Sequence, residues 1–143
     1  MAVRRMERRA ADNVYLHRDF HGALNCCLTW LERHGGPTAA REYLQRFAAA
    51  WYAPLTRDVS RRGISAIRDH IERIYRTEGV AVSFQSRDND LLVEIPFCPA
   101  ISWMHAHQIP VSPLFFETTR TVYQTICKGT GTSFAVLRYD PET

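Results

Sequence analysis

The segment VAVSFQSRDNDLLVEIPFC, residues 80–98, decides the fold class. Apolar residues alternate with small or polar ones over residues 80–84, and residues 91–97 form a second, more apolar run. The sequence Asp-Asn-Asp at residues 88–90 separates the two runs, and such residues favour turns because their side chains hydrogen-bond to the nearby backbone. The pattern therefore predicts a β-hairpin.

The sequence before this hairpin predicts helices. Apolar residues recur at helical spacing from Asn13, a residue suited to the N-cap, until the two glycines at 35–36 end the helix. Pro37 suits the first turn of a second helix over residues 38–53, and Pro54 is expected to close it.

Two more helical segments lead up to the hairpin. A short amphipathic piece over residues 55–62 stops at Gly63. Residues 64–79 then carry a clear apolar stripe at helical spacing, formed by Ile64, Ile67, Ile71, Ile74 and Tyr75.

The sequence after the hairpin predicts two helices and a final strand. Pro99 suits the first position of a helix through about His107, and a further helix is expected over residues 112–128, ended by a Gly-Thr-Gly sequence. Residues 133–139 form the last predicted strand. Helices first and a small antiparallel sheet second indicate an α+β fold, with an N-terminal helical layer packed on the sheet.

The composition is that of one globular domain. Of the 143 residues, 45% are hydrophobic and 23% are charged, which argues against a disordered chain. We expect residues 1–12 to form a basic, disordered tail and residues 13–143 to form a single α+β domain. A chain of this length can bury one real core.

Several classes of protein are disfavoured. No apolar run reaches the roughly 18 residues that a membrane helix needs. The net charge of +3 comes largely from four arginines near the start of the chain, too local a surplus to indicate nucleic-acid binding. No apolar stretch follows this basic start, so we expect no secretory signal, and the four cysteines contain no C-x-x-C pair. Reduced thiols in the cytoplasm are expected. Dinucleotide and phosphate loops, H-E-x-x-H and G-x-S-x-G motifs are absent.

The stretch YLHRDFHGAL, residues 15–24, holds the first candidate site residues. His17 and His21 are four residues apart, so they share a helix face beside the apolar stripe. A partly buried imidazole there is suited to act as a base or a metal ligand. The alternative is a hydrogen-bonded histidine at the edge of the core. Asp19 points elsewhere on a straight helix and is expected to pair with an arginine or with another element.

Cys98, in the sequence IPFCPA, is the second candidate. A cysteine between a strand and a helix lies at the positive end of the helix, where the dipole and backbone N–H groups stabilise a thiolate. We therefore expect its pKa to be lowered and its sulfur to be ready to act as a nucleophile. The alternative is a small buried residue that happens to precede a proline.

Further residues can complete a pocket. His105 lies about two helical turns from Cys98, and Arg120 and Tyr123 lie with Glu117 on one side of the next helix. Glu117, Arg120 and Tyr123 could bind a small polar substrate, although a solvated helix face explains Glu117 and Arg120 equally well. The large aromatic residues are expected in the core, among them Trp30, Trp51, Phe115 and Phe116.

A zinc site is an alternative reading of the same residues. Three histidines and one cysteine could form it on paper, but their spacing fits no standard zinc pattern. We therefore expect no cofactor and keep zinc as the alternative. The set would consist of His17, His21, Cys98 and His105.

Three stretches resemble the L-2-amino-thiazoline-4-carboxylic acid hydrolase family: YLHRDFHGAL, REYLQRFAAAWYAPL and the Cys-Pro element. Their order and spacing are similar from about Tyr15 to about Tyr139. The resemblance implies a helical half and then a small sheet with the Cys-Pro element at its centre. It also implies hydrolytic opening of a cyclic amidine, converting 2-aminothiazoline-4-carboxylate into S-carbamoyl-cysteine. Family members continue into another strand, so we expect an open sheet edge that a homodimer covers.

Two routes to ring opening fit these residues. In the first, the Cys98 thiolate adds to the carbon between sulfur and nitrogen, His21 shuttles the proton, and Asp19 or His17 orients the site. In the second, His21 activates water directly, and Cys98 is a metal ligand or a packing residue. Arg120 is expected to bind the substrate carboxylate.

Two other functional classes compete with the hydrolase. A non-catalytic small-molecule or metal-binding module of the same fold would tolerate an inert Cys98. A structural or assembly partner is less favoured, because histidines lie on an otherwise apolar face. The expected partners are a small-molecule substrate and a second copy of the chain, with no nucleic acid and no membrane.

Overall fold

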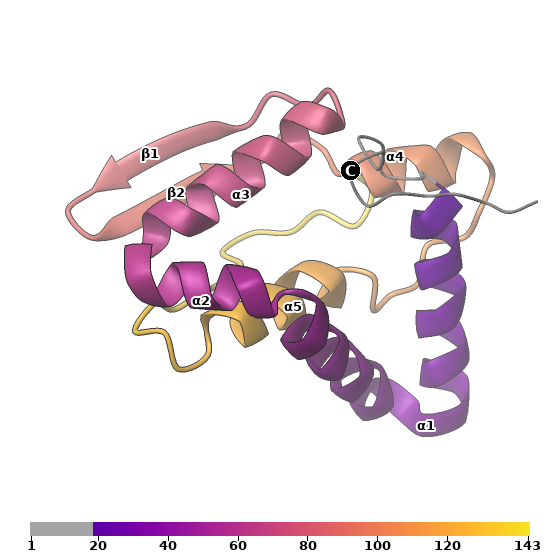
Figure 1. Ribbon diagram of the computed structural model, residues 1–143. Helices are drawn as coiled ribbons and strands as arrows, with labels where there is room; N and C mark the ends of the chain where they lie inside the picture. The colour runs from indigo at the N-terminus through magenta and orange to yellow at the C-terminus, as the bar shows by residue number, and fades with distance from the viewer. Residues whose placement is uncertain (1–18) are drawn as a thin grey trace, which may run out of the picture.

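The structure is a computed structural model that describes residues 19–143 (Figure 1). The predicted tail, Asn13 and His17 lie outside this range. Within residues 19–143, three helices precede a β-hairpin and two follow it, so the fold is α+β, as the sequence predicted. The elements are α1 (Asp19–Trp51), α2 (Ala53–Arg62), α3 (Ile64–Thr77), β1 (Ser83–Arg87), β2 (Asp90–Glu94), α4 (Pro99–Ala106) and α5 (Glu117–Cys127).

Helix α1 consists of two arms that meet at Gly36, and Figure 1 shows the sharp bend between them. Gly36 has a φ of 73° and a ψ of 179°, a conformation that residues with a Cβ rarely adopt. Pro37 follows directly, and its fixed φ suits the first turn of the second arm. The predicted end of the first helix at residues 35–36 is confirmed.

The second arm of α1 ends at Trp51, and Tyr52 separates it from α2. The helix end predicted before Pro54 therefore lies within two residues of the observed one, and Pro54 itself lies in the first turn of α2. Proline is tolerated there because the first N–H groups of a helix have no partner within it. Gly63, with a φ of 61°, ends α2 as expected.

Strands β1 and β2 pair antiparallel, with Phe84 opposite Val93. Asp88 has a φ of 48°, which aspartate tolerates in tight turns. The predicted hairpin is therefore confirmed. Both Phe84 and Val93 are half-buried and pack against the core, and the guanidinium of Arg68 in α3 lies 5.3 Å from the centre of the Phe84 ring.

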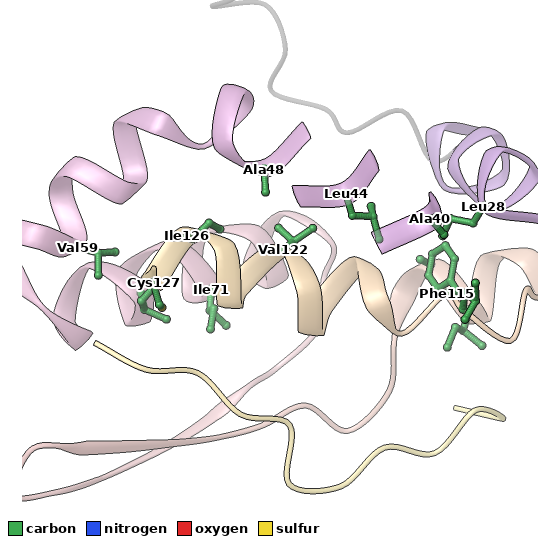
Figure 2. Packing of buried hydrophobic residues seen from close by; sticks show 14 of the residues in the cluster. Leu28, Ala40, Leu44, Ala48, Val59, Ile71, Phe115, Val122, Ile126 and Cys127 are labelled. Carbon is green, nitrogen blue, oxygen red and sulfur yellow. The ribbon is translucent and has the colours of Figure 1, made fainter. Parts of the chain in front are cut away.

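The main core lies between α5 and the other helices (Figure 2). Leu44 and Ala48 of α1 are four residues apart, as are Val122 and Ile126 of α5, so each pair occupies one helix face. Figure 2 shows these two faces meeting. Burying one such leucine or isoleucine stabilises the fold by about 2 kcal/mol. The largest fully buried apolar side chains of the core are those of Leu28, Leu44, Val59, Ile101, Met104 and Ile126.

Two predictions for the last third of the chain are wrong. The helix expected from residue 112 begins at Glu117, because residues 113–116 form a turn. Residues 133–139 form no strand, and within the described range their backbone makes no hydrogen bond to another backbone segment. They have a strand-like apolar alternation, but a strand also needs a neighbour to pair with.

Two of the aromatic residues expected in the core lie at the surface. Trp30 and Trp51 are 59% and 71% exposed, whereas Phe115 is buried and Phe116 is half-buried. Trp30 stacks on His34 in the next turn of α1, with ring centres 4.3 Å apart. Helical spacing places such residues beside the apolar stripe without showing which of them the neighbouring helices cover.

The described part of the chain contains no helix long and apolar enough to cross a membrane. Its four cysteines carry free thiols, as the sequence predicted. They are Cys26, Cys27, Cys98 and Cys127.

Candidate functional site

A contact between a histidine and a glutamate lies where the first turn of α1 meets the end of α3. Nε2 of His21 is 3.5 Å from Oε1 of Glu78, and the two side chains are 18% and 6% exposed. Both atoms are themselves buried from solvent. Charges attract more strongly in such a setting than at the surface. A separation of 3.5 Å is nevertheless longer than a good hydrogen bond.

Gly22 explains how α1 comes so close to this part of the molecule. A Cβ at Gly22 would lie 3.2 Å from Cζ3 of Trp103 and 3.5 Å from Cδ1 of Ile109. The first distance is tighter than most side-chain contacts, so a larger residue would require the Trp103 ring to shift by a few tenths of an ångström. The missing side chain thereby fixes the neighbouring His21 against the end of α3.

Cys98 is the N-cap residue of α4. Burial raises the pKa of its thiol, the backbone N–H groups of Ile101 and Ala100 oppose this rise, and the Glu78 carboxylate adds to it. The net result is a raised pKa, so the sulfur carries its proton at neutral pH. The expected lowering of the pKa is therefore wrong, because desolvation of a charged sulfur outweighs the helix end.

Tyr75 lies one turn before Glu78, on the same face of α3. Burial raises the pKa of its phenol, and the nearby Cys98 and Glu78 raise it further. The hydroxyl therefore keeps its proton and can donate a hydrogen bond to a ligand. Together His21, Glu78, Cys98 and Tyr75 form one group, which we call the α1–α3–α4 cluster.

Sequence reasoning missed Glu78 as a member of this cluster and gave Tyr75 only as part of the apolar stripe of its helix. Glu78 is the C-cap residue of α3, and a carboxylate there faces the negative end of the helix dipole, which is unfavourable. An acidic residue at a predicted helix end is the signal that could have found it. Glu78 links the two predicted residues, since it contacts His21 and raises the pKa of Cys98.

Of the three other residues predicted at this site, only His105 can be placed relative to the cluster. His17 and the side chain of Asp19 lie outside the described part of the chain. His105 is exposed in the last turn of α4, seven residues after Cys98. At 1.5 Å per residue this places the two about 10 Å apart along the helix axis.

Arg120, expected to bind the substrate carboxylate, donates hydrogen bonds to Glu117 instead. Glu117 is fully buried and also accepts bonds from Arg41 (2.9 Å) and Thr121 (2.6 Å). Burial raises the pKa of the Glu117 carboxyl, but the hydrogen bonds of its three donors outweigh this and lower it. We call these four residues the Glu117 cluster, and it joins α1 to α5.

Tyr123, the other substrate-binding candidate on α5, belongs to the aromatic core. Its ring stacks on Phe134 at 4.9 Å and meets His70 edge-on at 6.2 Å. Burial raises the pKa of Tyr123. Burial and the charge of Arg73 lower the pKa of His70 to about 4. Both side chains are therefore uncharged at neutral pH.

Two surface hollows lie away from the α1–α3–α4 cluster. One, of about 250 Å³, lies between α3 and the hairpin and is lined by Glu72, Arg76 and Phe84 among others. The second, of about 290 Å³, follows α5 and is lined in part by Lys128 and Phe134. Neither includes a residue of the cluster. Within residues 19–143, no three histidine, cysteine or acidic side chains gather closely enough to hold a metal ion.

Comparison with known proteins adds no relative. No family model, no curated protein and no solved structure matches this chain. The resemblance to the thiazoline hydrolases therefore stays an expectation from the sequence.

Proposed function

We propose that this chain is a hydrolase that opens a cyclic amidine, with His21 as the acid–base residue and Glu78 as the carboxylate that orients it. The contact of Nε2 of His21 with Oε1 of Glu78, at 3.5 Å and buried from solvent, carries this proposal. A carboxylate beside an imidazole holds the ring in one orientation and stabilises the imidazolium that forms during proton transfer. The resemblance to the thiazoline hydrolases supports a substrate such as 2-aminothiazoline-4-carboxylate.

The reaction consumes one water molecule. Water adds across the ring C=N bond, so that its oxygen joins the carbon between sulfur and nitrogen and a proton joins the nitrogen. The single C–N bond then breaks, the hydroxyl becomes a carbonyl, and the leaving nitrogen takes the hydroxyl proton to become an amine. His21 accepts the proton of the attacking water and delivers it to the ring nitrogen.

Cys98 supports the water route better than the thiolate route. Burial raises the pKa of its thiol, and a protonated sulfur is a poor nucleophile. In this proposal Cys98 packs beside the reacting ring and Tyr75 donates a hydrogen bond to the substrate. The four free thiols fit a reducing, cytoplasmic setting. A homodimer remains a prediction, to be tested by sedimentation.

The direct test incubates the protein with 2-aminothiazoline-4-carboxylate and follows S-carbamoyl-cysteine by mass spectrometry. We expect turnover, and we expect His21→Asn to lower kcat/KM at least about 100-fold, the usual size of an acid–base contribution. Cys98→Ser should lower it by less than about tenfold, because the thiol is not the nucleophile. His34→Asn makes the same change at an exposed position of α1 and should leave kcat/KM unchanged.

Two results would decide against this mechanism. Activity that survives in His21→Asn but is lost in Cys98→Ser would establish the thiolate route. Tight binding of the substrate by calorimetry without any product would favour the non-catalytic module. One observation favours that alternative: the backbone N–H of Cys98 already donates a hydrogen bond to the oxygen of Thr143 at 2.6 Å, so the neighbourhood of the thiol is partly covered.

A further inference from the structure

Residues 134–143, which we call the strap, cross the molecule from the loop after α5 to the start of α4 (Figure 1). The strap contains no helix or strand. Within the described range its backbone makes one hydrogen bond to another backbone segment, the bond from the N–H of Cys98 to the oxygen of Thr143. The strap is therefore held in place mainly by contacts of its side chains.

Two aromatic contacts attach the strap to α5 and its N-cap. The ring of Phe134 stacks on Tyr123 at 4.9 Å, and the ring of Tyr139 lies 5.3 Å from that of Phe116. Between these contacts the side chain of Leu137 is 81% exposed and that of Val136 is half-buried. The far end of the strap is thus fixed by one aromatic contact and one backbone hydrogen bond.

This far end lies over Cys98. The backbone N–H of Cys98 donates a hydrogen bond to the oxygen of Thr143. Burial raises the pKa of the Tyr139 phenol, and the nearby Cys98 raises it further. Cys98, the N-cap residue of α4, is half-buried. The Tyr139–Thr143 end of the strap therefore forms part of the surroundings of Cys98.

Opening this end would cost little free energy. A single hydrogen bond and a single aromatic pair each contribute little net free energy, because water and other contacts replace them when the segment opens. Segments with few buried contacts and few backbone hydrogen bonds open locally while the helices stay folded. The core helices, by contrast, are tied together by fully buried side chains.

We propose that residues 134–143 are a strap that opens at its Tyr139–Thr143 end without unfolding of the helices, and that this opening controls access to Cys98. That the opened strap also admits a substrate to His21 and Glu78 rests on the proposed function. Control of access to the thiol does not rest on it.

The test measures the rate at which iodoacetamide alkylates each cysteine, resolved by mass spectrometry of peptides. Tyr139→Ala removes the aromatic contact and should raise the limiting alkylation rate of Cys98 at least about tenfold. The rate is compared at pH values above the pKa of the thiol, so that a change in access is separated from a change in pKa. Leu137→Ala, at an exposed position of the same strap, should leave the rate unchanged.

The other cysteines report on the rest of the fold. Cys26 is exposed and calibrates the reagent, whereas Cys127 is buried in α5 and reacts only when the core opens. Equal acceleration at Cys127 and Cys98 would mean general unfolding and would overturn the proposal. An unchanged Cys98 rate in Tyr139→Ala would overturn it as well.

Hydrogen exchange gives a second measurement on the same variant. The amide of Cys98 should exchange at least about tenfold faster in Tyr139→Ala, while the amide of Ser102, bonded within α4 to the carbonyl of Cys98, should not change. Equal rates for Cys98 in both proteins would contradict the strap. If Cys98 responds but no variant hydrolyses the thiazoline, the strap stands and the proposed hydrolase falls.

Discussion

The Glu117 cluster and the α1–α3–α4 cluster each place a carboxylate between α1 and another helix, but the contacts of the two carboxylates differ. Glu117 is fully buried and accepts hydrogen bonds from two arginines and a threonine. At Glu78 the neighbouring imidazole stands 3.5 Å away. The first carboxylate is held by hydrogen bonds from several donors, whereas the contact of the second with His21 is longer than a good hydrogen bond.

The difference separates a structural role from a chemical one. A buried carboxylate with short bonds to several donors has its desolvation offset and its protonation state fixed. Nε2 of His21 is buried but makes no hydrogen bond within the described part of the chain, and such incomplete satisfaction is costly in a purely structural site. Deviations of this kind are concentrated at functional sites, so the comparison favours chemistry at His21.

The largest expected effect on stability comes from breaking the Glu117 cluster. Glu117→Ala leaves two arginines facing each other without the carboxylate and opens a cavity beside Thr121. Loss of one partner from a buried ion pair costs about 3–5 kcal/mol, and the partial exposure of both arginines places the expected loss near the lower end. Urea unfolding measures it.

The matched control is Glu42→Ala, which removes an exposed carboxylate from the same arm of α1. It should change the free energy of unfolding by less than about 0.5 kcal/mol. Equal losses of unfolding free energy in the two variants would show that the two arginines do not depend on Glu117. The structural role assigned to Glu117 would then be wrong.

A second prediction concerns the pH dependence of stability on the α5 side of the molecule. His70 is 8% exposed between Tyr52 and Tyr123, with Arg73 against its Nδ1. Its pKa is lowered from 6.5 to about 4 in the folded protein. Above pH 6.5 the residue is neutral in both states and its contribution is fully present. As the pH falls from 6.5 to 4, the unfolded chain takes up the proton first, so stability is lost, by about 3 kcal/mol in total.

His70→Phe keeps a ring between the two tyrosines and removes the titration. The difference in unfolding free energy between the wild type and this variant should therefore fall steadily from pH 6.5 to pH 4 and then level off. A difference that stays flat over this range would show that His70 titrates normally. In that case burial between Tyr52 and Tyr123 would not keep the His70 side chain neutral.

Most helix ends could be predicted because they are local. The glycine at 36 and the glycine at 63 both adopt a positive φ, and Pro99 opens α4, so each acts through its own backbone preference. The hairpin turn at Asp88 is of the same kind. These features depend on one or two residues and need no knowledge of the rest of the chain.

The misplaced features depend on distant partners. Residues 133–139 have the alternation of a strand, but no described segment pairs with them. The raised pKa of Cys98 comes mainly from burial under other elements, which the helix dipole argument could not include. His21 was predicted from its position beside the apolar stripe, whereas its neighbour Glu78 is 57 positions away in the chain and becomes visible only once α1 and α3 are packed.

The smallest expected effect on stability, and the sharpest contrast with Glu117, comes from Glu78→Gln. The amide keeps the shape of the side chain and loses the attraction to His21, which lowers stability. It also removes a negative charge from the C-terminal end of α3, which raises stability by about 0.3–1 kcal/mol. Because these effects oppose each other, the free energy of unfolding should change by less than about 1 kcal/mol, measured by urea unfolding beside Glu117→Gln.

The Glu78→Gln variant should also lose at least about 100-fold in kcat/KM, since it can no longer stabilise the imidazolium. Destabilisation as large as that of Glu117→Gln would instead make the His21–Glu78 pair a structural link and remove the reason to place acid–base chemistry there.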